Sequence, residues 1–108
     1  MLVDSHCHLD FPDFAPELDA IIERARAAGI GRMVSISTRV KKHGQILAIA
    51  ENYPEIFCSV GTHPHNADEE MDVTAADLMA ISKHPKVVAI GEAGLDYHYD
   101  KSDRANQA

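Results

Sequence analysis

The stretch LVDSHCHLD, residues 2–10, places two histidines one residue apart directly after the first apolar residues of the chain. In extended backbone, side chains two positions apart point to the same side, so His6 and His8 should converge, with Asp4 and in principle Asp10 beside them. Neutral imidazoles bind zinc and related ions, and neighbouring carboxylates bind metal or orient an imidazole. The alternative is a pair of polar residues satisfied by water. The pattern with Asp4 favours a metal site at the end of a strand.

The same order of a short apolar strand followed by a helix repeats along the chain. Strands are predicted at residues 2–3, 32–37, 56–60 and 87–90, and helices at 18–28, 40–52 and 74–81, with a further helix beginning in 102–108. Thr74 and Asp77 resemble a capping box that opens the third helix. Alternating strands and helices imply parallel strands joined by right-handed crossovers, and therefore an α/β fold.

Polar motifs fall where three of these strands end. The H-x-H motif follows the first strand, GTHPH (residues 61–65) follows the third, and Glu92 follows the fourth. The carboxyl ends of the strands carry the active site in a (β/α)₈ barrel and the ligand crevice in an open doubly wound sheet, and the dispersed motifs favour the barrel. Because a barrel takes about 200 residues or more, residues 1–108 are predicted to form the N-terminal half of a single TIM-like barrel domain, with about the first four β/α units.

Composition excludes several classes of protein. The chain has 45% apolar and 25% charged residues, as a globular domain does, and no apolar run approaches the roughly 20 residues of a membrane span. No secretory signal is visible, so a cytoplasmic protein with free thiols at Cys7 and Cys58 is expected. The net charge of −7 argues against a broad electrostatic grip on nucleic acid, but it leaves open a metal-centred site for phosphate esters.

Three motifs together resemble the TatD family of metal-dependent hydrolases, a branch of the amidohydrolase-like barrels. They are DSHCHLD (4–10), GTHPH (61–65) and GEAGLDYHYD (91–100), in the order and at approximately the separation that the family shows. The resemblance covers essentially the whole chain but only the N-terminal part of a typical member. It implies a TIM-like barrel that holds two divalent ions, Mg, Zn or Mn, and hydrolyses phosphodiester bonds in DNA as a deoxyribonuclease.

The resemblance also assigns roles to individual residues. His6 and His8 match ligands of the first metal, and Glu92 matches the carboxylate shared between the two metals. His63 and His65 match the G-x-H-P-H element at the mouth of the barrel, which implies contact with substrate. His63 is expected to act on substrate phosphate or on the attacking water, so Glu92 and His63 are the candidate catalytic residues. In the structural alternative, both histidines only serve the hydrogen bonds of a rigid loop.

Other polar residues carry weaker expectations. Asp96 matches the family's G-L-D element, where it would contribute to substrate binding by orienting a ligand or Tyr97, or serve as a structural hydrogen-bond partner. His43 and His84 are expected to face solvent. A basic cluster at a helix start could meet nucleic-acid phosphate or form a solvated face; it consists of Arg39, Lys41 and Lys42.

Two other functions stay open at this level. Dihydroorotase-like amidohydrolases also begin with D-x-H-x-H and cleave C–N bonds, although the G-E-x-G-L-D context of Glu92 favours phosphodiesters. Alternatively, the chain is a non-catalytic half-barrel that associates with another chain. The family's other metal ligands lie in later strands, so this chain alone is expected to be inactive. Open strand edges predict that it self-associates or belongs to a longer chain, because apolar residues lose their neighbours; these are Val34, Ile36, Val60, Val88 and Ile90.

Overall fold

The computed structural model describes all 108 residues and contains one sheet of four parallel strands in the order β1-β2-β3-β4. The strands are β1 (Leu2–Cys7), β2 (Ile30–Ser35), β3 (Ile56–Val60) and β4 (Val87–Ile90). The helices are α1 (Leu18–Ala27), α2 (His43–Asn52), α3 (Ala75–Ser82) and α4 (Arg104–Gln107). One long helix separates each strand from the next, which is the succession of β/α units that the sequence pattern predicts.

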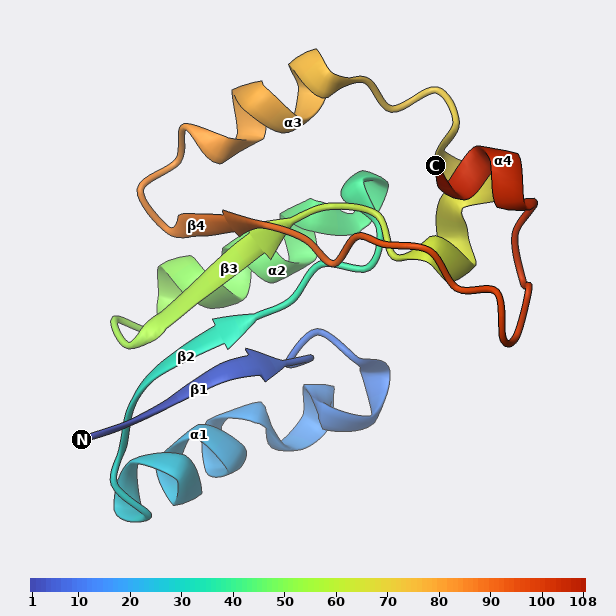
Figure 1. Cartoon of the computed structure of the whole chain (residues 1–108). Helices are drawn as coiled ribbons and strands as arrows, with labels where there is room; N and C mark the ends of the chain where they lie inside the picture. The colour runs from blue at the N-terminus through green and yellow to red at the C-terminus, as the bar shows by residue number, and fades with distance from the viewer.

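The arrangement places all four carboxyl ends of the strands on one side of the molecule. In Figure 1 the strands run from the N-terminal side toward the loops at the right, where the segment after β4 and helix α4 lie. Helix α4 contacts the 3₁₀ segment Pro64–Glu70, which follows β3. Segments far apart in the sequence therefore meet at the carboxyl end of the sheet.

The hydrophobic core lies between the sheet and helices α1 and α2. Ile22, Ile46 and Ile56 are fully buried, and burial of each such side chain contributes about 1.5–3 kcal/mol. Cys58 belongs to the same core, and Cys7 packs against it. Both thiols are free, as predicted, and burial raises the pKa of Cys58 to about 11 and that of Cys7 to about 12. These thiols stay protonated and are poor nucleophiles.

The first two strands differ from the sequence-based prediction. Strand β1 continues to Cys7, so His6 lies within the strand and not after it. Strand β2 starts and ends two residues earlier than predicted, because Leu2 pairs with Ile30 at the start of the ladder. After β2 the chain leaves the regular ladder, and Ser37 N–H donates to the hydroxyl of Ser59.

The prediction that His43 faces solvent is wrong. Its residue is only 4% exposed, and Nε2 donates to the carbonyl oxygen of Ser59 at 3.2 Å. His43, Ile46 and Ala50 follow helical spacing and form the buried stripe of α2, which places the imidazole against the sheet. Burial lowers the pKa of His43, so this side chain is neutral. His84 is partly exposed, with Nε2 3.4 Å from a carboxylate oxygen of Glu51.

The apolar residues expected to lack neighbours divide into two groups. Val88 and Ile90 on the edge strand β4 are 54% and 60% exposed. Val60 and Ile36 are buried and Val34 is partly buried, contrary to the prediction, because β2 and β3 are the inner strands of the sheet and Ile36 directly follows β2. Within the sheet, the exposed aliphatic side chains lie on the edge strands β1 and β4.

The capping box predicted for the third helix is present. Thr74 Oγ1 accepts from Asp77 N–H at 3.1 Å, and Asp77 Oδ2 accepts from Thr74 N–H at 2.9 Å. These two bonds fix the start of α3 at the residue after Thr74. No helix of this chain has the length and apolar content to cross a membrane.

Candidate metal centre at the carboxyl end of the sheet

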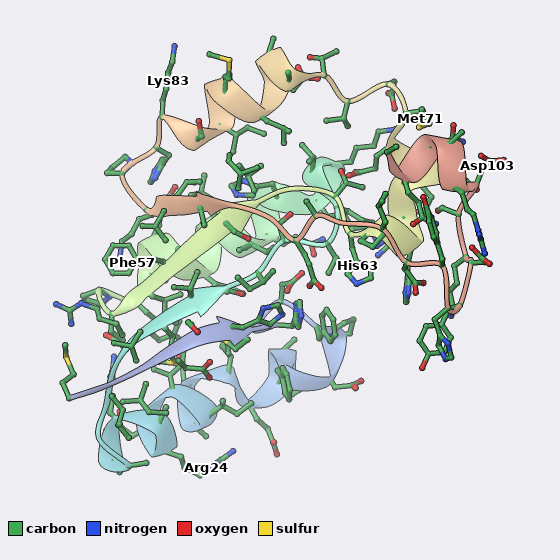
Figure 2. The ribbon with its side chains drawn as sticks, viewed as in Figure 1. Arg24, Phe57, His63, Met71, Lys83 and Asp103 are labelled. Atoms are coloured by element: carbon green, nitrogen blue, oxygen red, sulfur yellow. The ribbon has the colours of Figure 1, made fainter.

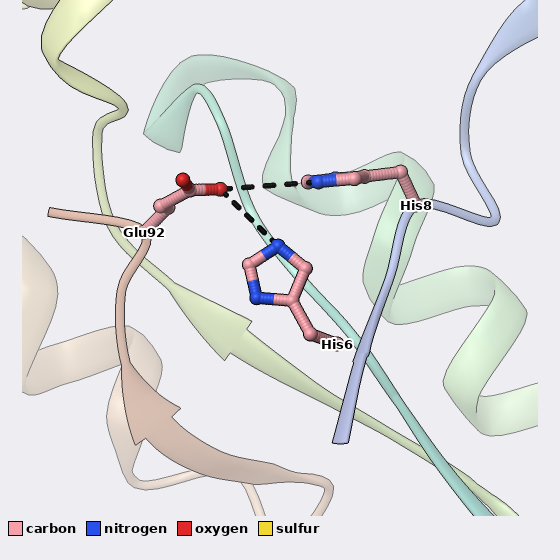
Figure 3. A group of neighbouring side chains, drawn as sticks. All are labelled: His6, His8 and Glu92. Carbon is pink, nitrogen blue, oxygen red and sulfur yellow. Dashed lines mark ion pairs between the residues drawn. The ribbon is translucent and has the colours of Figure 1, made fainter. Parts of the chain in front are cut away.

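Two imidazoles and one carboxylate converge where β1 and β4 end. The Nε2 atoms of His6 and His8 lie 3.5 and 3.8 Å from Oε2 of Glu92. Figure 3 shows both rings directed at this carboxylate, and the three ligand atoms lie within 4.8 Å of one another. The structure thus brings together the three residues that the resemblance implied as metal ligands, from segments more than 80 positions apart in the sequence.

Hydrogen bonding sets the tautomer of His8 in favour of metal binding. Its Nδ1 lies 3.1 Å from the carbonyl oxygen of Ile36, and since a carbonyl can only accept, Nδ1 carries the proton. The lone pair of a neutral His8 is then on Nε2, the atom that faces Glu92 and His6. A backbone carbonyl behind a ligating imidazole is the usual way in which proteins fix a metal ligand.

The two flanking aspartates do not add ligand atoms to this group. Asp4 Oδ1 accepts from the backbone N–H of His6 at 3.1 Å, so it orders the strand beside the ligand. Asp10 has one buried carboxylate oxygen without a hydrogen-bond partner, and burial raises the pKa of this side chain. Asp4 thus does not join the imidazoles as expected, because it bonds to the local backbone, and the possible convergence of Asp10 is not observed, because Asp10 lines a separate hollow.

Buried serines, which the sequence analysis missed, fix the position of Glu92. The backbone N–H of Glu92 donates to the carbonyl of Ser37 at 2.9 Å, and the hydroxyl of Ser59 donates to Gly91 at 2.7 Å. A Cβ atom at position 61 would lie 2.6 Å from the backbone of Gly91. Position 61, where the ends of β3 and β4 come close together, therefore needs glycine. The sequence signal that could have indicated these buried serines is their position in predicted strands next to apolar residues.

His63 contacts the other oxygen of Glu92. Its Nδ1 accepts from the backbone N–H of His65 at 3.0 Å, and its Nε2 lies 3.3 Å from Glu92 Oε1. Burial lowers the pKa of His63, against an opposing effect of Glu92, so the ring is neutral with its proton on Nε2. His63 therefore donates to Glu92, and Figure 2 shows its ring at the carboxyl ends of the strands.

His65 pairs with Asp96 and not with Glu92. Nε2 of His65 lies 2.8 Å from Asp96 Oδ2, while Asp96 Oδ1 accepts from the backbone N–H groups of His98 and Tyr99. Partial burial opposes ionisation of Asp96, but these two N–H groups and the imidazole together hold its pKa below the usual value. Asp96 thus positions His65 and the turn at residues 96–99, and it makes no hydrogen bond to the side chain of Tyr97.

Glu70, a second residue that the sequence analysis missed, anchors the loop that carries His63. This buried carboxylate accepts from the backbone N–H groups of Val40 and Lys41 at 2.7 and 2.9 Å and from the hydroxyl of Thr62 at 2.6 Å. It joins the loop after β2 to the loop after β3. A buried acid can be recognised only once the fold is known, because the sequence shows an acidic run, DEE (68–70), that reads as solvent-exposed.

A polar groove of about 630 Å³ passes over the three candidate ligands. Its walls include His63, His65, Phe11, Arg39 and Lys101. The basic cluster expected to meet phosphate is largely paired within the chain, since Arg39 Nε donates to Glu69 at 2.7 Å and Lys41 Nζ lies 2.8 Å from Asp72. Of that cluster, only Arg39 reaches the groove.

The donor set suits a divalent transition metal or zinc. Two neutral imidazoles and one carboxylate are ligands that zinc and related ions prefer, and three protein ligands leave coordination positions open. The second oxygen of Glu92 faces His63, away from the two imidazoles. The arrangement can therefore hold an ion at the floor of a groove open to solvent.

Comparisons with known proteins follow the same motifs. The family model described as TatD related DNase matches residues 3–108. The uncharacterized metal-dependent hydrolase YjjV of Escherichia coli is 39% identical over 100 residues, which are 91% of this chain and 39% of that protein. The 3'-5' ssDNA/RNA exonuclease TatD of Erwinia tasmaniensis is 38% identical over 109 residues, 99% of this chain and 42% of that protein. The chain thus spans about two fifths of the length of these curated relatives.

Solved structures agree on the fold. The crystal structure of YjjV from Escherichia coli, described as a TatD homolog, superposes with a TM-score of 0.86 at 36% identity, covering 98% of this chain and 42% of that one. A hydrolase TatD family protein from Entamoeba histolytica gives a TM-score of 0.85 at 23% identity, which bears on the fold alone, and covers 98% of this chain and 42% of that one. The predicted TIM-like barrel is confirmed, with its first four β/α units in this chain.

Proposed function

The chain belongs to the TatD-related DNase family, and on that premise we propose that it contributes the first part of a divalent-metal-dependent hydrolase that cleaves phosphodiester bonds in DNA. The observation that carries the proposal is the convergence of His6, His8 and Glu92 at the carboxyl end of the sheet. That end is where barrel enzymes place their catalytic groups. The cytoplasmic location and self-association stay predictions from the sequence.

In this proposal, His6, His8 and Glu92 hold the metal. These residues would hold a divalent ion that, when bound, would supply Lewis-acid chemistry: a lower pKa of bound water and compensation of negative charge on a phosphate ester. His8 contributes through Nε2, because its Nδ1–H is held by the carbonyl of Ile36. Glu92 presents Oε2 to the two imidazoles and Oε1 to the opposite side, which suits a carboxylate shared between two ions. We propose Mg, Zn or Mn, with the remaining ligands in later strands of the family fold.

His63 acts beside the metal ligands in this scheme. Its Nε2–H donates to Glu92 in the free protein, which orients the carboxylate. A substrate phosphate in the groove offers the same N–H another acceptor, so His63 is placed to contact a phosphate oxygen. His65, held by Asp96, lines the same groove and is the second candidate for substrate binding.

Phosphodiester cleavage is preferred to the two alternatives. Several relatives are named 3'-5' ssDNA/RNA exonuclease, so we carry a single-stranded nucleic acid over as the proposed substrate class. No contact described above favours a cyclic amide substrate. A non-catalytic half-barrel would not need two imidazoles and a carboxylate converging in a solvent-filled groove, and we therefore propose residues 1–108 as part of a catalytic domain.

The test is a chimaera in which residues 1–108 replace the matching segment of the Erwinia exonuclease. We expect metal-dependent hydrolysis of a single-stranded oligonucleotide and none of a cyclic amide, with activity lost in the Glu92→Gln variant. The 108-residue chain alone should hydrolyse DNA much more slowly. A folded chimaera that cleaves the amide and spares DNA, or keeps its nuclease activity as E92Q, would contradict the proposal.

A further inference from the structure

Phe11 is the one apolar residue among those that line the polar groove. Its ring lies against the imidazole of His8, with the ring centroids 4.7 Å apart and the planes at 15°. Even with this face covered, 41% of the residue remains exposed. An aromatic ring that is half exposed inside a polar groove contributes little to the core, so its position calls for another explanation.

The backbone holds this ring in place. Phe11 N–H donates to the carbonyl of His8, and the carbonyl of Phe11 accepts from Phe14 N–H at 3.0 Å. Pro12 follows directly and starts the 3₁₀ segment Pro12–Glu17, which fixes the chain direction after Phe11. A rigid backbone and a ring already stacked on one side reduce the conformational entropy lost when a second flat group stacks.

We propose that Phe11 is the stacking platform for one nucleobase, that of the nucleotide whose phosphate lies over His6, His8 and Glu92. The inference rests on the proposed function and adds a base subsite to it. The Phe11 ring lies next to the candidate ligands, because it stacks on the imidazole of His8. Nε2 of this imidazole lies 3.8 Å from Glu92. A base and its own phosphate can therefore occupy the platform and the metal centre together.

The surrounding charges agree with a nucleotide at this position. Arg39 lines the main groove, where Glu69 pairs with it, and also a smaller hollow of about 110 Å³ on the side of Phe11. Lys42 and the carboxylate of Asp10 line that hollow too, and Lys101 adds a further cation to the main groove. Cationic groups beside an aromatic platform match the phosphates that flank a stacked base. Since a base must be unpaired to lie flat on one side chain, the subsite selects single strands, and it tolerates any base because every base has a π face.

The test measures binding of a single-stranded oligonucleotide with phosphorothioate linkages to the whole chain in the presence of Mn²⁺, by fluorescence anisotropy. We expect Phe11→Ala to weaken binding about tenfold, within the range that stacking on one aromatic side chain gives. Phe11→Tyr should keep the wild-type affinity. Phe14→Ala is the matched control, because Phe14 is similarly exposed at 38% but lies outside the groove, and it should leave binding unchanged.

Removing bases from the oligonucleotide one at a time separates stacking from a structural role. One abasic position should cost wild-type protein the same factor as F11A, and F11A should lose nothing further with that oligonucleotide. Mn²⁺ affinity by calorimetry should be equal in wild type and F11A. Three results would overturn the inference and leave the proposed function standing. They are unchanged DNA binding in F11A, a loss from the abasic position that adds to the loss from F11A, and a lower Mn²⁺ affinity in F11A. A wild-type chain that binds no oligonucleotide would overturn the inference, and the chimaera described above tests the proposed function separately.

Discussion

Two histidine pairs with the same spacing, His6-x-His8 and His63-x-His65, end in opposite arrangements. The first pair lies in and just after strand β1, and both rings send Nε2 toward the same oxygen of Glu92. The second pair brackets Pro64 at the start of a 3₁₀ segment, and its rings address different acids, Glu92 and Asp96. The rings lie close together in both pairs, with centroids 5.1 Å apart for His6 and His8 and 4.3 Å apart for His63 and His65. The pairs differ in where the Nε2 atoms point: toward one acid in the extended first pair, and toward two acids in the second pair, where Pro64 turns the chain.

The tautomers of the two pairs differ as well. His8 meets a carbonyl through Nδ1, so its free Nε2 lone pair is available to a metal, but His63 meets a backbone N–H through Nδ1, so its Nε2 carries the proton. His8 therefore supplies an electron-pair donor, and His63 supplies an N–H donor. The hydrogen-bond partner of Nδ1 therefore decides whether Nε2 of an imidazole binds metal or donates a hydrogen bond.

The largest expected effect is on Zn²⁺ affinity when the first pair of histidines is removed. Replacing both His6 and His8 by alanine removes two of three converging ligand atoms, and the affinity for Zn²⁺ at neutral pH should fall more than about 100-fold, beyond the 10–100-fold typical of outer-sphere changes. Isothermal titration calorimetry measures this loss. Wild-type affinity should also decrease on acidification, because imidazole must be deprotonated to bind. Equal affinity in the double variant would rule out this ligand set.

The next substitution removes Glu70, which anchors the loop that carries His63. Glu70→Ala should lower the free energy of unfolding by about 2–4 kcal/mol, because the backbone N–H groups of Val40 and Lys41 lose a charged acceptor. Glu69→Ala is the neighbouring control: Glu69 forms only an exposed ion pair with Arg39, and its loss should leave the free energy of unfolding almost unchanged. Urea denaturation compares the two, and similar losses would show that Glu70 is not a special anchor.

A smaller effect concerns His43, the buried histidine outside the two pairs. His43 has a lowered pKa in the folded chain, so as pH falls below the unfolded value of about 6.5 the unfolded state takes up a proton and the folded state does not. This contribution to stability is present above that pH and is lost on acidification toward the folded pKa. His43→Gln should therefore flatten the pH dependence of the unfolding free energy between pH 7.5 and 5.5. An unchanged slope would show that the burial of His43 does not govern it.

The smallest expected effect tests the separation of the two pairs. Asp96→Asn weakens the contact to His65 but touches none of the three candidate ligands, so Zn²⁺ affinity should change by less than about tenfold. The nitrogen chemical shifts of His65 should change in the same variant, which shows that the substitution acts locally. A loss of affinity as large as that of H6A/H8A would move Asp96 into the metal site.

Local patterns were enough to predict most of the fold. The boundaries of β3 and β4, the capping box at Thr74 and the parallel order follow from apolar runs and capping signals. Strand β2 was displaced by two residues, since register depends on pairing with β1, which no local pattern encodes. His43 was misplaced for a similar reason: a single polar residue on an apolar helical stripe looks solvent-exposed until its backbone partner, Ser59, is known.

The site divides in the same way. The candidates His6, His8, Glu92, His63 and His65 could be selected from the sequence because they stand in motifs at or near the ends of predicted strands. The residues that support them, Ser37, Ser59 and Glu70, were missed because their contacts join segments more than 20 positions apart. Orientation was also out of reach, since the tautomers of His8 and His63 depend on the backbone groups that the fold supplies.

The central claim, that the first pair and Glu92 form the metal centre, is tested most directly by anomalous diffraction from crystals of the chain grown with Zn²⁺. We expect one strong peak between Nε2 of His6, Nε2 of His8 and the carboxylate of Glu92, at ligand distances of about 2.0–2.2 Å. A peak between His65 and Asp96 with none at Glu92, or no peak at these strand ends, would contradict it.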